Sequence, residues 1–170
     1  AVLYSYVVTT IATNGLEESV ASSVATATGD ITIANQYVTV NWTDGSGLNV
    51  RYHVYRLTQG VYGFIGMAGA SGFVDKNIVP DTSRTPPINS TPFTGAGNYP
   101  AAVAYAEQRR CFGGTTSKPQ TLWMTRTGTE ANMSYNVPLR DDNRIEVRVA
   151  AREASAIRHI VPIGQMLLMT

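Results

Sequence analysis

The sequence predicts an all-β protein. Hydrophobic residues make up 44% of the 170 positions and charged residues only 15%. Thr, Ser and Gly fill much of the remainder, and together with the frequent Val and Tyr they favour strands and turns. Apolar and polar residues alternate with period two in several segments, and Gly, Asn and Asp stand between these segments.

The first half of the chain contains the clearest strands. Residues 4–12 alternate aromatic and β-branched side chains, and Asn14-Gly15 is a turn signal directly after them. Further strands are predicted over residues 19–28, 37–42 and 50–57. These segments carry the hydrophobic content that a buried core requires.

Glycine then stands at every third position from Gly60 to Gly72. Collagen would need many more such triplets and abundant Pro. A phosphate-binding loop would open a helix and usually carries a Lys, and neither follows here. The stretch therefore predicts a hairpin: Gly60 turns the chain, residues 62–66 form a short strand with Phe64 pointing inward, and residues 69–72 turn it again. The three-residue spacing is incidental in this interpretation.

Residues 78–100 hold five of the eight prolines, which remove ladder donors and fix φ. We therefore expect a first domain over residues 1–77, a Pro-rich linker over 78–98 and a second domain over 99–170. Strands of the second domain are predicted over residues 101–108, 109–115, 121–127, 144–151, 156–161 and 165–170. Residues 102–115 and 156–170 share one pattern, an apolar strand, a turn, a second apolar strand and a final Thr.

One segment has a helical alternative. Arginines recur every fourth residue from Arg140 to Arg152, which would place them on one side of a helix. Alternation of apolar residues from Ile145 to Ala151 favours a strand instead. A short helical turn within residues 152–158 remains open.

Four strings in the first domain resemble a fibronectin type III domain. VTVNW, YHVYR, YGFIG and SGFVD resemble its strands B, C, C′ and E, and Trp42 stands where that family keeps its core Trp. YSYVVTTIATNGLEESVASSV resembles its strands F and G, which here come first. The resemblance implies either a circularly permuted sandwich, with the F–G hairpin beside strand C, or the end of a preceding domain. The strand count over residues 1–77 favours permutation.

The second domain resembles the tail nozzle, or packaged-DNA stabilisation, proteins of short-tailed bacteriophages. The string NYPAAVAYAEQRRCFGGTTSKPQTLWMTRTG is similar to the opening blade of their β-propeller, and residues 141–170 resemble its continuation. The matching residues are Tyr99, Pro100, Val103, Gln108, Arg109, Phe112, Gly113, Gly114, Pro119, Gln120, Trp123 and Gly128. A closed propeller needs at least four blades, so we expect a fragment of a longer protein or strands that pair with other chains.

The resemblance implies a structural, non-enzymatic component of a phage tail or neck. It implies a ring-shaped homo-oligomer, a hexamer in the nozzle relatives, around a channel that DNA crosses without sequence-specific contact. Other neck or tail proteins would be its partners. It would lie in the tail of the virion and be assembled in the cytoplasm of the bacterial host.

The candidate functional surface is basic. Arg144, Arg148 and Arg152 share one face of a predicted strand with Glu146. Such a face could line a DNA channel through charge alone. A solvated face, or one that forms salt bridges between subunits, is the plainer interpretation and the one we favour.

We find no catalytic, cofactor or metal site in the sequence. His53 and His159 lie in different domains, and Asp141-Asp142-Asn143 lacks the spacing of a calcium loop, so we interpret it as a turn. Cys111 is the single cysteine, which excludes a disulfide framework, and we expect a buried structural thiol. The net charge of +1 gives no general attraction to nucleic acid, and no apolar run is long enough for a membrane anchor.

The alternative function is a fibronectin-like adhesion or carbohydrate-associated binding module of a secreted bacterial protein. Exposed aromatic residues would favour it, and the candidates are Tyr62, Tyr99, Tyr105 and Trp123.

Overall fold

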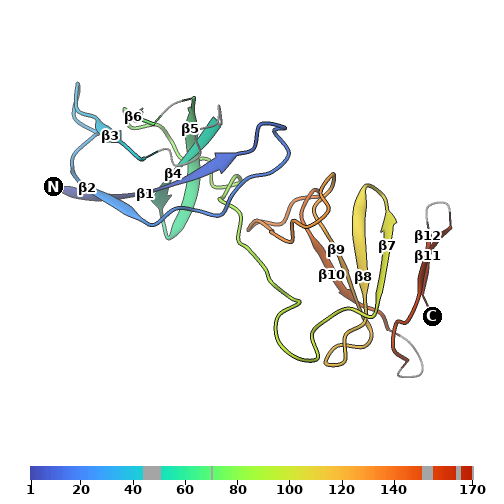
Figure 1. Cartoon of the computed structure of the whole chain (residues 1–170). Helices are drawn as coiled ribbons and strands as arrows, with labels where there is room; N and C mark the ends of the chain where they lie inside the picture. The colour runs from blue at the N-terminus through green and yellow to red at the C-terminus, as the bar shows by residue number, and fades with distance from the viewer. Residues whose placement is uncertain (44–50, 70, 151–154, 164–165, 170) are drawn as a thin grey trace. The chain divides into compact units, whose positions relative to one another are not determined.

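The computed structural model describes residues 1–43, 51–69, 71–150 and 155–163, and the backbone of 166–169. These residues form antiparallel strands and no helix, which confirms the all-β prediction (Figure 1). They divide into two compact units. Unit 1 comprises residues 1–88 with 136–138, and unit 2 comprises residues 89–135 with 139–170.

Unit 1 contains a four-stranded sheet and a two-stranded sheet. The larger sheet consists of β1 (Val2–Ile11), β2 (Ala25–Gly29), β4 (Arg51–Thr58) and β5 (Val61–Ala68), in the order β2-β1-β4-β5. The smaller sheet pairs β3 (Val38–Val40) with β6 (Phe73–Asp75). Because β1 pairs directly with β4, the first hairpin lies beside the strand predicted over 50–57.

The core of unit 1 lies between these sheets. Tyr6, Val54 and Ile65 from the larger sheet are buried against Val40 of the smaller one, and Trp42 packs at the edge of this cluster. A buried ion pair closes one side, where Arg56 Nη1 donates to Asp75 Oδ2 at 2.6 Å. Tyr6 donates to the same oxygen at 2.9 Å, so the Asp75 charge is fully compensated inside the core.

The glycine stretch forms the predicted hairpin, and two of its glycines also have a packing role. Gly60 turns the chain with φ of 83°. A Cβ on Gly63 would lie 2.7 Å from Pro80, and one on Gly66 would lie 2.6 Å from the Phe73 ring. A bulge opposite Val54 puts both on the same face of β5, where each lets another segment pack closely. Phe64 is half-buried on the opposite face from Gly63, away from the core between the sheets, so the prediction that it points inward is wrong.

Two serines explain why β2 begins at Ala25 and not at residue 19 as predicted. Ser19 Oγ accepts the Thr10 amide at 2.9 Å, and Ser22 Oγ accepts the Val8 amide at 3.1 Å. These hydroxyls occupy the positions that strand carbonyls would take in a regular ladder. The returning chain therefore follows β1 from Glu18 onward, but its regular pairing starts only after the serines.

The Pro-rich segment predicted as a linker packs against β5 and against residue Val137, which is distant in sequence. Asp81 pairs with Phe64 of β5 through backbone hydrogen bonds of 3.0 and 2.9 Å, and the Arg84 guanidinium lies 3.8 Å from the centre of the Phe64 ring. Thr85 donates to the carbonyl of Val137 at 2.9 Å and accepts its amide at 3.3 Å. The division between the units falls inside the segment, after Ile88.

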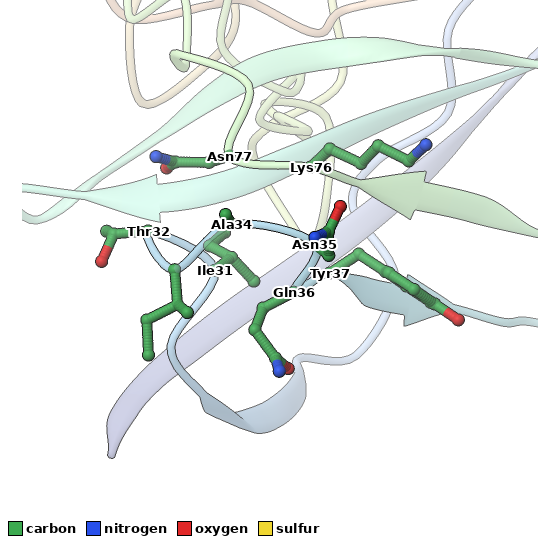
Figure 2. A pocket seen from close by; sticks show the side chains of 9 residues that line it. Ile31, Thr32, Ala34, Asn35, Gln36, Tyr37, Lys76 and Asn77 are labelled. Carbon is green, nitrogen blue, oxygen red and sulfur yellow. The ribbon is translucent and has the colours of Figure 1, made fainter.

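Loop residues 31–37 connect β2 and β3 and lie beside Lys76 and Asn77, which follow β6 (Figure 2). The backbone of this loop is held by local hydrogen bonds. Asp30 Oδ1 accepts the Thr32 amide and hydroxyl at 3.0 and 2.5 Å, and the Gln36 amide donates to the Ile33 carbonyl at 3.1 Å.

Unit 2 contains a four-stranded sheet in which each strand pairs with its neighbour along the chain. Its strands are β7 (Ala102–Ala106), β8 (Arg109–Gly113), β9 (Thr121–Met124) and β10 (Ile145–Arg148). A separate hairpin consists of β11 (Ile160–Ile163) and β12 (Met166–Met169). The two segments with a shared pattern are thus both hairpins, β7–β8 and β11–β12.

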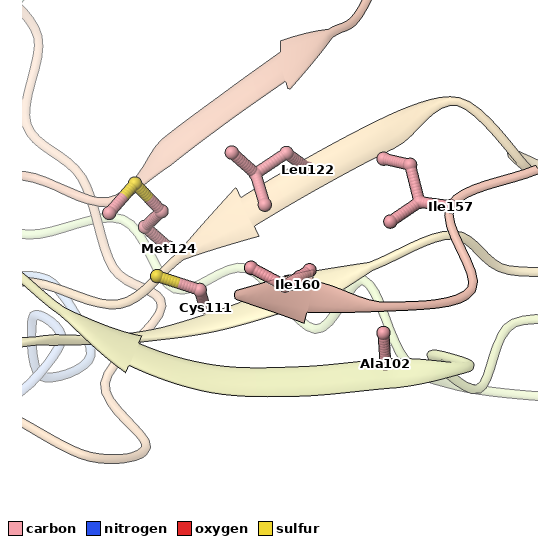
Figure 3. Packing of buried hydrophobic residues seen from close by; sticks show 6 residues of the cluster. All are labelled: Ala102, Cys111, Leu122, Met124, Ile157 and Ile160. Atoms are coloured by element: carbon pink, nitrogen blue, oxygen red, sulfur yellow. The ribbon is translucent and has the colours of Figure 1, made fainter. Parts of the chain in front are cut away.

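The start of β11 and the segment before it pack on one face of the four-stranded sheet. Ile157 and Ile160 are buried against Ala102, Cys111, Leu122 and Met124 (Figure 3). Gly113 permits this close packing, because a Cβ there would lie 2.5 Å from Ile157 and 2.8 Å from Ile160. The opposite face carries Trp123, whose ring meets the Phe93 ring edge-on at 5.3 Å between centroids.

A buried arginine organises the loops of unit 2. Arg109 lies at the start of β8, and its guanidinium donates to the carbonyl groups of Thr125, Asn143 and Asp141 at 2.6, 2.6 and 2.7 Å. Each of the three carbonyls belongs to a loop that leaves or enters the sheet. One side chain therefore satisfies backbone acceptors that the strands leave unpaired.

Candidate functional site

The charged surface of unit 2 is built on β10. Glu146 lies between two cations: Lys118 Nζ is 3.1 Å from its Oε1, and Arg144 Nη1 is 2.6 Å from its Oε2. Burial alone would raise the pKa of Glu146, but the hydrogen bonds from Arg144 and Lys118 outweigh it and lower this pKa. Glu146 therefore stays ionised at neutral pH and holds both cations in place.

Arg148 extends this surface into a shallow hollow. Lys118, Thr121, Glu146 and Arg148 line a depression of about 600 Å³ beside the start of β9. Lys118 and Arg148 are exposed, and Glu146 is the carboxylate among the lining residues. Because Glu146 pairs with Lys118, the hollow keeps a net positive charge through Arg148, which can attract an anion by charge without a fixed binding geometry.

Of the three arginines predicted to share a face, two are described by the structure. The Arg144 guanidinium lies 5.0 Å from the centre of the Tyr135 ring and pairs with Glu146, so its positive charge is largely neutralised. The Arg148 side chain is exposed to solvent, and Arg152 lies outside the described residues. Sequence reasoning missed Lys118, whose turn before β9 comes beside β10 through the β9–β10 pairing.

A second group of polar residues lies on the outer face of the larger sheet in unit 1. Oε1 of Glu18 accepts from Thr9 Oγ1 and from the Tyr55 hydroxyl, both at 2.5 Å, and lies 3.2 Å from His53 Nδ1. Sequence reasoning treated His53 as isolated. The signal that could have linked it to Glu18 is the return of the first hairpin along β1, which places both residues beside Thr9.

This group is largely enclosed: the side chains of His53 and Glu18 are 13% and 16% exposed. The rings of His53 and Tyr55 both meet Phe64 edge-on, at 5.1 and 5.8 Å between centroids. Burial raises the pKa of Tyr55, and the adjacent Glu18 charge raises it further. Tyr55 therefore acts as a hydrogen-bond donor, and the arrangement stabilises the fold without leaving an open nucleophile.

Other predicted residues have structural positions. Cys111 is fully buried, and burial raises the pKa of its thiol, so its arginine neighbours do not activate it. The Asp-Asp-Asn segment is a turn, in which the Asn143 amide donates to the Arg140 carbonyl at 3.0 Å and Asp142 pairs with Arg126. His159 is exposed. Trp123 is 1% exposed, so its prediction as an exposed aromatic residue is wrong. Tyr99 and Tyr105 are exposed, and Tyr62 is half-buried.

Within the described ranges, His, Cys, Asp and Glu do not gather into a group of three that could hold a metal ion. No helix in that part of the chain has the length and hydropathy to span a bilayer. Comparison of this chain with models of known families, with curated proteins and with solved structures gives no match.

Proposed function

We propose that this protein is a structural, non-enzymatic component of the tail or neck of a short-tailed phage. The observation that carries the proposal is that residues of the string resembling the nozzle proteins have structural roles in unit 2. Arg109 binds three loop carbonyls, Gly113 admits the β11 segment and Trp123 is buried. A string whose residues pack both faces of one sheet and hold its loops supports kinship more strongly than one scattered over a surface.

The proposed fold of unit 2 is the beginning of a β-propeller. A blade is a four-stranded antiparallel sheet, and β7–β10 have that connectivity. The next blade would start with a hairpin packed on the face of the first, and the β11–β12 hairpin with Ile157 and Ile160 has that position. The proposal treats further blades as parts of a longer chain or of neighbouring chains.

The proposed fold of unit 1 is a circularly permuted fibronectin type III-like sandwich. With the strand letters that the sequence resemblance implies, β2-β1-β4-β5 corresponds to G-F-C-C′ and β3-β6 to B-E. Strands C, F and G share one sheet in sandwiches of this kind, and B and E share the other. The pairing of β1 with β4 supports this assignment.

The charged surface of β10 could lie either between neighbouring subunits of the ring or on the wall of its channel. Between subunits, Lys118 and Arg148 would meet acidic side chains of the next copy, and at the channel wall they would face DNA phosphates. Neither position involves recognition of DNA bases, which suits a channel that passes DNA of any sequence.

The test is the association state of the full chain in solution. We expect light scattering to report concentration-dependent association, and electron microscopy to show closed rings. A double variant, K118E with R148E, separates the two roles of the charged surface. Loss of association assigns it to the subunit interface, while unchanged association with weaker binding to a short DNA duplex assigns it to the channel. A sharp monomer at every concentration would contradict the proposal.

A further inference from the structure

One side of β10 has no strand beside it. β10 is the outermost strand of the four-stranded sheet, and among the described residues it pairs with β9 alone. All four of its residues are exposed. The open side of an edge strand presents backbone N–H and C=O groups to which a strand of another chain can bind.

The pairing with β9 determines which backbone groups of this edge are free. The Val149 amide donates to the Gln120 carbonyl at 2.8 Å, and this pair continues the register between β9 and β10. Because backbone groups point to alternate sides along an antiparallel strand, those of residues 145, 147 and 149 face β9. The backbone groups of Glu146 and Arg148 therefore face outward, and within the described ranges none of them forms a hydrogen bond.

The side chains of this edge alternate between charged and apolar. Glu146 and Arg148 lie on one face of the sheet, and Ile145 and Val147 lie on the other, which holds the buried cluster of unit 2. Ile145 and Val147 are 38% and 45% exposed, and Val149 packs against the cluster. The edge thus carries an apolar row on one face and one charge of each sign on the other.

One antiparallel register between this edge and a second copy of itself suits both the backbone and the charges. Outward-facing residues must stand opposite one another to form the hydrogen-bonded pairs. If Val147 stands opposite Val147 of the second copy, Glu146 stands opposite Arg148 in both directions. Each of these two pairs exchanges backbone hydrogen bonds and brings unlike charges together.

The other registers are less favourable. In the two adjacent ones, either Glu146 or Arg148 stands opposite its own copy, and like charges directly opposite each other destabilise a strand pair. The register centred on Ile145 would need the amide of Arg144, which already donates to the Ser134 carbonyl at 3.3 Å. The edge is therefore self-complementary in a single register.

The signs of the charges matter because charged side chains often keep edge strands apart. An edge of one sign repels its own copy in every register, whereas this edge carries both signs at alternate positions. Arg148 forms no ion pair with a described carboxylate, while Glu146 also holds Lys118 and Arg144. The charges consequently select the register, and the backbone hydrogen bonds and the Val147 contact supply the attraction.

We propose that two copies of this chain associate through β10, whose free edges pair antiparallel and join the two four-stranded sheets into one. The copies are related by a two-fold axis, so the contact closes at two chains. The inference goes beyond the proposed function, because a larger ring joins two different surfaces of each subunit and this contact uses one surface twice.

The experiment is disulfide trapping in the full chain. Val147→Cys puts a thiol opposite its own copy, where the Cα atoms of such a pair lie about 4.5 Å apart, within reach of a disulfide. Ile145→Cys is the matched control, because it is exposed on the same face but would lie about 13 Å from its copy. Cys111 is fully buried and does not compete. Under mild oxidation we expect V147C to form a covalent dimer on non-reducing gels and I145C to remain largely monomeric.

A second measurement tests the backbone pairing by sedimentation equilibrium. Arg148→Ala removes the charge, and Arg148→Pro also removes an outward N–H without touching the bonds to β9, as edge strands tolerate. We expect the dimer dissociation constant to rise about threefold in R148A and about tenfold further in R148P. Trp123 fluorescence reports whether each variant is folded, and if R148P is not, the cysteine pair decides alone.

Three outcomes overturn the proposal: equal cross-linking of V147C and I145C, no V147C dimer at millimolar chain concentration, or equal dissociation constants for folded R148A and R148P. Rings that form without the V147C cross-link also refute this inference, but leave the proposed function intact. Cross-linked dimers without rings support the inference and count against the proposed function. The cysteine variants change no charge, so they do not disturb attraction to DNA.

Discussion

At the scale of single residues, one oxygen atom of Glu18 ties its own segment to two strands of unit 1, β1 and β4. It accepts hydrogen bonds from Thr9 on β1 and from Tyr55 on β4, and His53 Nδ1 lies at 3.2 Å. An ionised carboxylate can only accept, so His53 Nδ1 carries a proton. Burial alone would raise the pKa of Glu18, but the hydrogen bonds from His53, Thr9 and Tyr55 outweigh it and lower this pKa.

Glu18→Gln should therefore destabilise the protein in a pH-dependent way. We expect a loss of about 1–2 kcal/mol in the free energy of unfolding at pH 7, because hydrogen bonds to a charged acceptor are replaced by neutral ones. A lowered folded-state pKa stabilises above the unfolded-state pKa of about 4.3, and this contribution disappears as the pH falls through the folded-state value. Urea unfolding at a series of pH values should show the difference between the two proteins shrinking below about pH 4.

The matched control is Glu17→Gln, which alters an exposed neighbour. It should leave the unfolding free energy within about 0.5 kcal/mol of the unaltered chain at every pH. A constant difference between E18Q and the unaltered chain, from pH 7 down to pH 3, would show that the ionised state of Glu18 contributes nothing.

Arg109 makes the second residue-level prediction. A lysine cannot reach three carbonyls that diverge around a planar guanidinium, so Arg109→Lys should cost about 2–3 kcal/mol of stability. The adjacent Arg110 pairs with Glu130, whose side chain is open to solvent. Arg110→Lys should therefore cost less than about 1 kcal/mol. Urea unfolding followed by Trp123 fluorescence compares the two, and equal losses would contradict the assigned role.

At the scale of elements, the β11 segment packs on β8 because Gly113 has no side chain. Gly113→Ala should displace Ile157 and Ile160 and cost about 1–3 kcal/mol, the usual effect of overfilling a packed core. Combining it with Ile157→Ala should restore part of the loss, because the shorter side chain leaves room for the new methyl group. Thermal unfolding of the single and double variants measures this coupling.

Gly29→Ala provides the control for that pair. Nothing lies within 4 Å of the position that its Cβ would take, and the residue ends β2. It should change stability by less than about 0.5 kcal/mol. If G113A were equally harmless, or if its effect simply added to that of I157A, the direct contact between β8 and the β11 segment would be refuted.

Period-two patterns predicted the existence of the strands well, because alternation is a local property. Their limits were less accurate where side chains replace backbone partners, as Ser19 and Ser22 do before β2. The packing role of Gly66 was hidden, since it depends on Phe73 of another strand. Likewise Arg144 and Arg148 were identified from their spacing, but Lys118 and Glu18 acquire their partners only through pairing between distant segments.

At the scale of the whole molecule, the two tryptophans report separately on the two units. Trp42 belongs to unit 1 and Trp123 to unit 2. Asn136 lies in the second half of the sequence but belongs to unit 1, where its amide donates to the Thr85 carbonyl at 2.7 Å. Replacing either tryptophan by phenylalanine isolates the fluorescence of the other.

Asn136→Ala should thus destabilise the unit reported by Trp42. The side chain is 1% exposed, so its removal leaves a buried carbonyl without this donor and should cost about 1–2 kcal/mol. Leu139→Ala, at a residue 75% exposed, is the control and should be close to neutral. A loss seen only through Trp123 fluorescence would contradict the assignment of Asn136 to unit 1.

The position of residues 136–138 also determines which truncated fragments contain a whole unit 1. A fragment that stops at residue 88 omits three residues of unit 1, including the partners of the Thr85 hydroxyl and carbonyl. The shortest uninterrupted coding stretch for that body extends to Pro138, and it necessarily encodes β7, β8 and β9 as well. In a series of C-terminal truncations, we therefore expect a folded, soluble unit 1 only when the fragment extends at least to Pro138.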